Sequence, residues 1–439
     1  MQTKLEGIAA KARKETNLQF TSLLHHITTE LIEESLRHIP KDSAAGVDGI
    51  SVEEAKQDFK KWSEKMLTEI HRQSYRPPEV LRVWIPKPGK TEKRPIGIPC
   101  IADRALQRSV STVLSAIYEQ DFLNCSFGGR PKRGQHNALA TFDAIVMGKK
   151  VSWVLEADLK NFFGSLDHGW LLKFVEHRVG DPRILTLIRR WLKAGVMENG
   201  KIEVSESGTP QGGSISVLLS NLYLHYVLDL WFEKAIKPKL RGECYLIRYI
   251  DDFIVCFQYH SDAVQFHKEL SIRLEKFSLK LEPNKTNLIE FGRFAKEDAK
   301  KDGRKPETIN FLGFTHYCTT SLEGKFKVGR KTEKSRLKRS ISKLQVKIGL
   351  NRHLPIKEQV DAINQTLRGH YNYYGMGGNH YSLQKVYIFV KKCWRKMLSS
   401  RSRKGKVTWE KFDRLIELFP LLRPKLSIPF NSMTKYVML

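Results

Sequence analysis

The sequence predicts an α+β fold, and three observations support this prediction. Through residues 1–75 apolar side chains recur every three or four positions, as in amphipathic helices. Residues 76–325 hold short apolar runs bounded by glycine, proline and aspartate, which is typical of strands joined by turns. The helical spacing returns over residues 326–405, and residues 406–439 form a short C-terminal segment. A chain of 439 residues is too long for one ordinary hydrophobic core, so several domains are expected.

The elements of the first hundred residues can be predicted in order. Two helices are expected in TSLLHHITTELIEESLRHI and SVEEAKQDFKKWSEKMLTEIH. In the loop between them, Ser51 can cap the second helix together with Glu54, three residues further on. The proline-rich stretch that follows contains VLRVWIP and RPIGIP, which we expect to pair as a hairpin across the charged turn PGKTEK.

The middle of the chain predicts strands and one long loop. VSWVLEADL (151–159) is expected to be a strand, followed by a helix near SLDHGWLLKFVEH. GTPQGGSIS (208–216) predicts a loop before an amphipathic helical stretch. CYLIRYIDDFIVCF predicts two short strands that meet at an acidic bend, and INFLGFTHY with FKVG predicts a closing hairpin.

Charge indicates the class of partner. The net charge is +28, and residues 325–406 hold 22 Lys and Arg against three acidic residues, so 19 of these charges lie in one segment. Such a concentration favours a nucleic-acid partner over a merely basic soluble protein. Six scattered cysteines without a CxxC pair argue against a zinc site or a disulfide framework. The N-terminus lacks the apolar core of a signal peptide and no run is long enough for a membrane span, so we expect a location inside the cell.

Asp251 and Asp252 stand side by side in the apolar run RYIDDFIV. Two buried like charges are unfavourable unless a cation compensates them. Rigid apolar strands that hold carboxylates suit Mg²⁺, which prefers hard oxygen ligands, and a two-metal site needs one more carboxylate. Asp158, at the end of VSWVLEAD, is the candidate. The alternative is a turn whose aspartates are solvated.

Six motifs occur in a familiar order: RPIGIP (94–99), ADLKNFFGSLDH (157–168), GTPQGGSISVLLSNLYLH (208–225), YIDD (249–252), LEPNKT (281–286) and INFLGF (309–314). In this order the chain resembles bacterial group II intron-encoded reverse transcriptases. GVDG (46–49) is similar to that family's N-terminal extension, and RGHYNYYG (368–375) to its maturase, or thumb, domain. The resemblance implies a right-hand polymerase, with fingers and an antiparallel palm sheet over 76–325 and a helical thumb over 326–405.

The resemblance also implies an activity and a set of catalytic residues. It implies an RNA-directed and DNA-directed DNA polymerase that extends a primer 3′-OH with dNTPs, using two Mg²⁺ ions with Mn²⁺ as a substitute. Asp158, Asp251 and Asp252 would bind the metals. Lys285 in LEPNKT would donate a proton to the departing pyrophosphate, the alternative being a solvated loop lysine.

Four further residues match the family's binding site for the incoming nucleotide. Lys87 and Arg94 would clamp the triphosphate, although a solvated basic turn is the alternative and fits Lys90 and Lys93 better. Phe163 would pack under the sugar and exclude a 2′-OH, whereas the adjacent Phe162 suits the core. The fourth, Gln211, would lie beside the bound nucleotide.

Two departures from the family pattern bear on the cellular role. No paired Cys and His ligands follow the thumb, so we do not expect the chain to cut target DNA. Ile250 replaces the small residue of the usual YADD, and our hypothesis is that it favours short or poorly paired primers, as in host DNA repair by end joining at short homologies.

Several readings of the function stay open on the sequence alone. An intron-bound maturase that assists RNA splicing and retromobility is the alternative to a polymerase. Phe163 and YIDD argue against a viral-type RNA polymerase. The expected partners are an RNA or DNA template with a DNA primer, with intron RNA as a further candidate, in a bacterial cytosol and without a membrane. The oligomeric state is left open.

Overall fold

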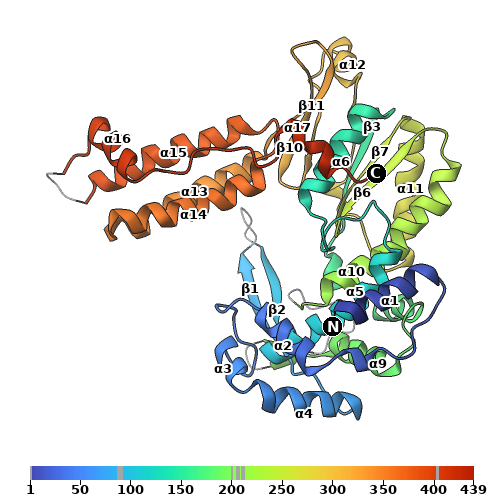
Figure 1. The fold of residues 1–439 in the computed structure, drawn as a ribbon. Helices are drawn as coiled ribbons and strands as arrows, with labels where there is room; N and C mark the ends of the chain where they lie inside the picture. Colours follow the sequence, from blue (N-terminus) through green and yellow to red (C-terminus); the bar gives the residue numbers. More distant parts are fainter. Residues whose placement is uncertain (1, 87–91, 199–200, 204–207, 209–212, 402–404) are drawn as a thin grey trace.

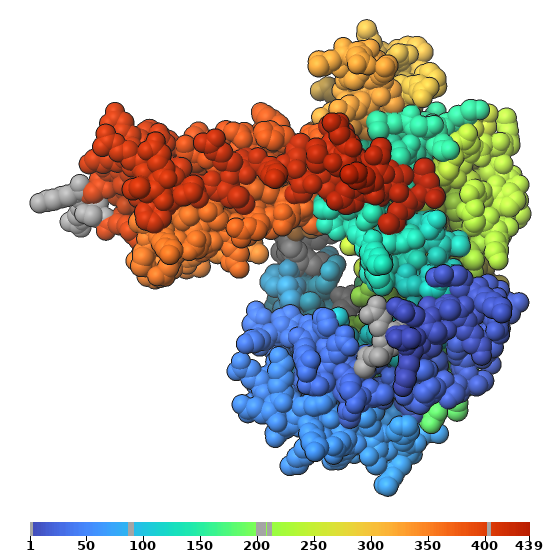
Figure 2. All heavy atoms as spheres, viewed as in Figure 1, coloured from blue at the N-terminus to red at the C-terminus, as the bar shows by residue number. Residues whose placement is uncertain are grey.

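The structure is a computed structural model that describes residues 2–86, 92–198, 201–203, 208, 213–401 and 405–439. A body of mixed helices and sheets carries an arm of helices that projects from it (Figure 1). The predicted α+β class is confirmed. Figure 2 shows that the arm overhangs the N-terminal half of the body, and that the surface is hollowed between the two.

The centre of the body is a four-stranded antiparallel sheet in the order β6-β7-β3-β8. Its strands are β6 (Cys244–Tyr249), β7 (Asp252–Phe257), β3 (Trp153–Asp158) and β8 (Asn287–Glu290). Along β7, Phe253 and Val255 join one hydrophobic cluster, and Ile254 joins another on the opposite face. Helices α11 (His260–Lys276) and α6 (Gln135–Gly148) cover these two faces (Figure 1). Since both faces are buried, β7 is continuously apolar after Asp252 rather than alternating.

The N-terminal half packs around the long helix α5 (Ile101–Asp121). Ser51 and Glu54 form the predicted capping box, and the predicted hairpin joins β1 to β2. A second sheet has the order β2-β1-β4-β5, with β1 and β4 parallel. The elements here are α1 (Gln2–Lys14), α2 (Thr29–Arg37), α3 (Val52–Gln57), α4 (Phe59–His71), β1 (Val80–Pro86), β2 (Lys93–Ile98), α7 (Phe162–Ser165), α8 (His168–Glu176), α9 (Pro182–Lys193), β4 (Val196–Glu198), β5 (Lys201–Glu203) and α10 (Ser216–Leu224).

The predicted closing hairpin was wrong in one respect, because a third strand is present. INFLGFTHY divides into β9 (Thr308–Phe311) and β10 (Phe314–Thr320), and β11 (Phe326–Thr332) pairs with β10. Between β9 and β10 the backbone turns through Leu312 and Gly313, both at positive φ, so one apolar run becomes two antiparallel strands. Helix α12 (Ala295–Lys301) precedes this sheet.

The arm has its own hydrophobic core and consists of α13 (Lys334–Leu350), α14 (Ile356–Tyr374), α15 (His380–Ser399) and α16 (Trp409–Leu418). After α16 the chain returns to the body, where α17 (Phe430–Met433) follows and the backbone N–H of Met438 donates to Thr141 Oγ1 of α6 at 3.0 Å. Within the described part of the chain, no helix combines the length and the apolar character that crossing a bilayer would require.

Asp181 fastens the N-terminal extension to the body. Its carboxylate accepts the backbone N–H groups of Leu23 (2.8 Å) and Leu24 (3.0 Å), and it also caps α9 through Arg183 N. We expect Asp181→Ala to lower the free energy of unfolding by about 2–4 kcal/mol, because a cap and two buried donors lose their partner. Asp167→Ala, which removes only the cap of α8, is the control and should cost about 1 kcal/mol in the same denaturant titration. Equal losses would contradict this role of Asp181.

Two buried histidines make the fold sensitive to acid. Burial lowers the pKa of His225 and of His370 to about 4. Both rings are neutral in the folded chain and titrate near 6.5 when it unfolds, so their stabilisation is full above pH 6.5 and is lost as the pH falls toward 4. Between pH 7 and 5 each should remove about 2 kcal/mol from the free energy of unfolding. His370→Leu should flatten this dependence in urea titrations, whereas replacing the exposed His353 by Gln should not. A His370→Leu profile as steep as the parent's would contradict the assignment.

Candidate active site

The three predicted aspartates meet where β3 and β7 end. Asp158 is the last residue of β3 and Asp252 the first of β7, and the two are paired across the strands in the sheet register. Asp251 precedes Asp252 in the turn from β6. Asp158 and Asp252, which are 94 positions apart in sequence, are therefore brought together by strand pairing alone.

Negative charge accumulates at this point. Burial and the neighbouring carboxylates of Asp158 and Asp251 raise the pKa of Asp252 to about 8. Burial also raises the pKa of Asp251, with Asp158 adding to the effect and Arg94 opposing it. Such an arrangement favours the binding of a cation, because a cation relieves both the burial cost and the repulsion.

Lys285 provides part of the compensating charge. It ends the short 3₁₀ helix Pro283–Lys285, and its ammonium forms an ion pair with Asp158 Oδ2. Burial disfavours the charged ammonium, but the hydrogen bond and the charge of Asp158 outweigh this effect and raise the pKa of Lys285. The structure thus places all four predicted catalytic residues together.

The donor set suits Mg²⁺ in its chemistry. Three carboxylates offer hard oxygen ligands, and the ion pair of Lys285 with Asp158 still leaves the pKa of Asp252 raised by burial and by the neighbouring carboxylates. Over the described ranges, no three His, Cys, Asp or Glu side chains already stand as a group able to hold an ion. Mg²⁺ usually keeps several waters and takes substrate phosphates as ligands, so a site completed by its substrate agrees with both observations.

The turn itself has an unusual backbone. Ile250 has a φ of 60°, in the left-handed region that a β-branched residue rarely adopts. Gly128 lies against it, since a Cβ on Gly128 would come within 2.7 Å of Ile250 Cγ1 and 2.8 Å of Ile250 N. The turn of residues 249–252, the candidate catalytic turn, is therefore strained and closely packed at Ile250.

Phe162 and Phe163 occupy different surroundings. Phe162 is buried in the core, as expected, whereas Phe163 is half-buried and lies edge-on to it, with ring centroids 5.3 Å apart. Gly208 lies beside them, and its backbone N–H donates to Leu166 O at 2.8 Å. The Phe163 ring is therefore partly accessible. Lys87 and Gln211, the other predicted nucleotide contacts beside Arg94, lie outside the described residues.

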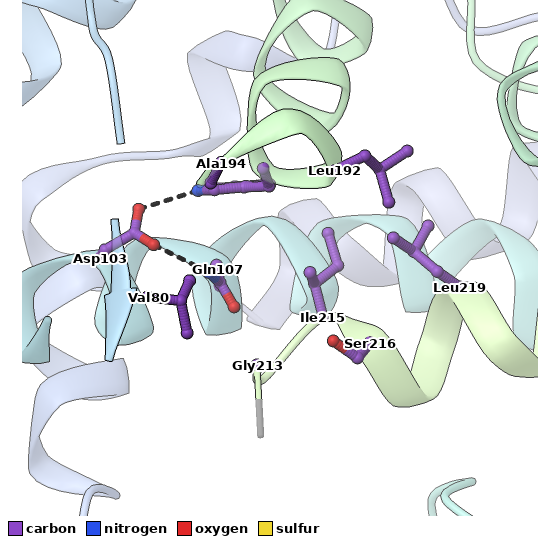
Figure 3. Close-up of a pocket in the computed structure, with 10 residues that line it drawn as sticks. Val80, Asp103, Gln107, Leu192, Ala194, Gly213, Ile215, Ser216 and Leu219 are labelled. Atoms are coloured by element: carbon purple, nitrogen blue, oxygen red, sulfur yellow. Dashed lines mark hydrogen bonds between the residues drawn. The ribbon is translucent and has the colours of Figure 1, made fainter. Parts of the chain in front are cut away.

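Gly213, shortly before α10, lies beside a buried polar cluster (Figure 3). The Asp103 carboxylate accepts hydrogen bonds from Tyr75 Oη (2.9 Å), Gln107 Nε2 (2.8 Å) and Trp191 Nε1 (2.8 Å). Gly213 passes so close that a Cβ there would lie 2.8 Å from Gln107 Oε1. A cavity of about 20 Å³ separates these groups from Ile215 and its neighbours. This cluster fixes the position at which the loop enters α10.

Two residues near the site escaped the sequence prediction. Burial chiefly raises the pKa of Glu156 to about 7, with Glu333 and Asp158 adding to it. Glu156 precedes Asp158 by two residues, so strand alternation could have placed both on one face. Arg248 contacts the catalytic turn from β6, and nothing in the spacing of RYIDD signals its burial.

Residues 85–316 match the family model described as reverse transcriptase (RNA-dependent DNA polymerase). This match covers more than half of the chain. The chain belongs to the reverse transcriptase family. The family implies the right-hand polymerase fold, so the sheet β6-β7-β3-β8 is the palm of this reverse transcriptase.

Individual relatives agree with this assignment. The chain is 32% identical over 231 residues to the group II intron-encoded protein LtrA of Lactococcus lactis subsp. cremoris, a match that covers 52% of this chain and 38% of LtrA. It is 33% identical over 250 residues to protein YkfC of Escherichia coli, covering 55% and 65% of the two chains. A weaker match, 23% over 181 residues, joins 36% of this reverse transcriptase to 24% of nuclear intron maturase 3 of Arabidopsis thaliana. The chain thus spans 38% and 65% of the first two relatives.

Proposed function

We propose that this reverse transcriptase is an active polymerase that copies an RNA or DNA template into DNA by extending a primer 3′-OH with dNTPs. The observation that supports it best is the pairing of Asp158 with Asp252 across two buried strands, beside Asp251. A solvated turn would not bring three carboxylates together in surroundings that raise the pKa of two of them, Asp251 and Asp252. The family match points to the same chemistry.

Within this proposal, the three aspartates and Lys285 each have a defined task. Asp158, Asp251 and Asp252 would hold two Mg²⁺ ions, which when bound activate the attacking hydroxyl and neutralise the leaving pyrophosphate. Lys285 carries the proton that the departing pyrophosphate needs, and its ion pair with Asp158 holds it at the site. The palm strands hold these groups rigidly, and positioning supplies most of the rate in phosphoryl transfer.

The incoming nucleotide would lie between the turn and the β1–β2 hairpin. The positive charge of Arg94 opposes the rise in the pKa of Asp251, so the two side chains interact. A triphosphate held by Arg94 would therefore lie next to the carboxylates. The partly accessible ring of Phe163 would meet the sugar. By their place in the family's motifs, Lys87 would contribute a second phosphate contact and Gln211 would border the base.

The arm supports a nucleic-acid partner. On α13, Leu344 and Ile348 are buried inside the arm, whereas Lys334, Lys338 and Lys343 are exposed. A helix with one apolar face and one basic face can track the phosphates of a primer–template duplex. The aromatics of RGHYNYYG pack internally, since Tyr371 is buried and Tyr374 lies on Phe314.

A maturase that assists splicing is the second candidate, favoured by the likeness to intron-encoded proteins. One experiment separates the two candidates. The parent and Asp251→Asn are compared in primer extension with Mg²⁺ and dNTPs, and in splicing of a group II intron RNA. Loss of extension in Asp251→Asn supports the polymerase. A parent that extends no better than Asp251→Asn, while both promote splicing, would overturn it.

For the cellular role we propose host DNA repair by end joining at short homologies, and Ile250 provides the test. Ile250→Ala relieves a β-branched residue held at positive φ beside the primer end. We expect the rate on 3′ overhangs of a few paired bases, relative to that on long templates, to fall about tenfold, equivalent to about 1.4 kcal/mol. Primer extension on both substrates measures this ratio. An unchanged ratio would contradict the role of Ile250.

A further inference from the structure

Behind the catalytic turn lies a fully buried ion pair. The guanidinium of Arg248 and the carboxylate of Asp229 are each 0% exposed, and they form a bidentate pair with distances of 2.7 Å (Nε to Oδ1) and 2.6 Å (Nη2 to Oδ2). Asp229 ends the π-helical turn His225–Asp229, which follows α10. Such π turns are rare and are often found at functional sites.

The other donors of this guanidinium are also satisfied. Nη1 donates to Asn221 Oδ1 (2.9 Å) and to the backbone oxygen of Ile250 (3.0 Å), and Nη2 donates to Ser126 Oγ (2.9 Å). All five N–H groups of the side chain are therefore used. One of them holds the backbone of the catalytic turn directly.

The same network holds the turn from its other side. Asn221 Nδ2 donates to the backbone oxygen of Gly128 at 2.8 Å, and Gly128 is the residue packed against Ile250. Arg248 also fixes this segment through its own backbone, because it accepts from Phe127 N and donates to Cys125 O. Ile250 is thus enclosed between a hydrogen bond to its carbonyl and a glycine that admits no side chain.

We propose that Arg248 is a positioning residue of the polymerase, which together with Asp229 and Asn221 holds Ile250 in its left-handed conformation and so aims Asp251 and Asp252. This inference rests on the proposed function but goes beyond it, since Arg248 touches neither the acids nor a substrate. A buried ion pair is weak evidence for stability alone, whereas a complete network can specify one conformation.

A matched control comes from another buried ion pair. Arg330 of β11 pairs with Asp143 of α6, and their side chains are 0% and 2% exposed. This pair joins the sheet β11-β10-β9 to α6, and the hydrogen bonds of Arg330, to Asp143 Oδ2 and Met433 Sδ, lie away from the catalytic turn. Arg330→Lys therefore reports what the loss of a buried guanidinium does to the fold in general.

The test compares Arg248→Lys, Asn221→Ala and Arg330→Lys with the parent. Asn221→Ala keeps the ion pair with Asp229, so it provides a milder variant. Amide hydrogen exchange is followed over residues 249–252 and, as an internal reference, over 244–247 of β6, alongside single-nucleotide incorporation with saturating dNTP. We expect Arg248→Lys and Asn221→Ala to exchange at least tenfold faster in the turn relative to β6, and to lose at least tenfold in kcat with KM changed less than threefold. Arg330→Lys should change neither the rate of exchange in the turn relative to β6 nor kcat.

The inference fails if the turn in Arg248→Lys and Asn221→Ala stays as protected as in the control, or if their kcat matches that of Arg330→Lys at equal folded fraction. Failure of the proposed function would look different. In that case the parent itself would not incorporate nucleotides, while hydrogen exchange would still report whether Arg248 holds the turn.

Discussion

Replacing Asp251 by asparagine is expected to reduce primer extension by about 10³-fold or more, with the fold unchanged. Asparagine keeps the size of the side chain but removes a charge that metal binding requires. The change also relieves repulsion within the acidic cluster, because Asp251 helps to raise the pKa of Asp252 to about 8. Thermal stability should therefore stay equal or rise while activity disappears, and initial rates of extension with melting curves measure both.

Asp262→Asn is the matched control for this substitution. Asp262 is buried and accepts a hydrogen bond from Gly242 N at 2.9 Å. Gly242 precedes β6, so this contact lies at the end of the strand away from the turn. We expect this variant to polymerise within about threefold of the parent, with a loss of stability on the order of 1–3 kcal/mol. If the two asparagine variants lost activity equally, the acidic turn would not be the reacting centre.

The second large effect is expected at Phe163. Phe163→Ala should lower the preference for dNTP over rNTP by about 10- to 100-fold, because the ring that we propose to meet the 2′ position is removed. Competition between dCTP and rCTP in single-nucleotide incorporation measures this preference as a ratio of kcat/KM values.

The neighbouring phenylalanine is the control for Phe163. Phe162 is 2% exposed, so Phe162→Ala should destabilise the fold by about 3–5 kcal/mol through a core cavity. Its sugar preference should stay near the parent's when measured well below its melting temperature. A preference that fell in Phe162→Ala and not in Phe163→Ala would show that the roles of the two rings are reversed.

Much of the fold could be predicted from local patterns. The capping box at Ser51, the hairpin of β1 and β2 and the acidic bend between β6 and β7 depend on short-range chemistry, and the structure has all three. The division of INFLGFTHY into two strands could not be predicted, because it requires Leu312 at positive φ, a conformation that tertiary packing imposes. The boundaries proposed near residues 75, 325 and 405 stay a prediction.

The site could be predicted only where the residue type itself indicates the chemistry. Paired aspartates in an apolar run indicate a cation site, and strand pairing then brings Asp158 to them. Arg248 gave no such signal, because an arginine in a strand is usually solvated. The four residues that its side chain contacts, Ser126, Asn221, Asp229 and Ile250, come from separate segments, so its burial is a property of the tertiary structure.

The most direct test of the central claim is the addition of one nucleotide by the parent chain. A primer annealed to an RNA template is mixed with a single complementary dNTP and Mg²⁺, and both the extended primer and the released pyrophosphate are measured. The polymerase account predicts one nucleotide added per primer, an equal amount of pyrophosphate, and no product with excess EDTA. A parent chain that binds the primer–template but adds no nucleotide with either Mg²⁺ or Mn²⁺ would contradict it.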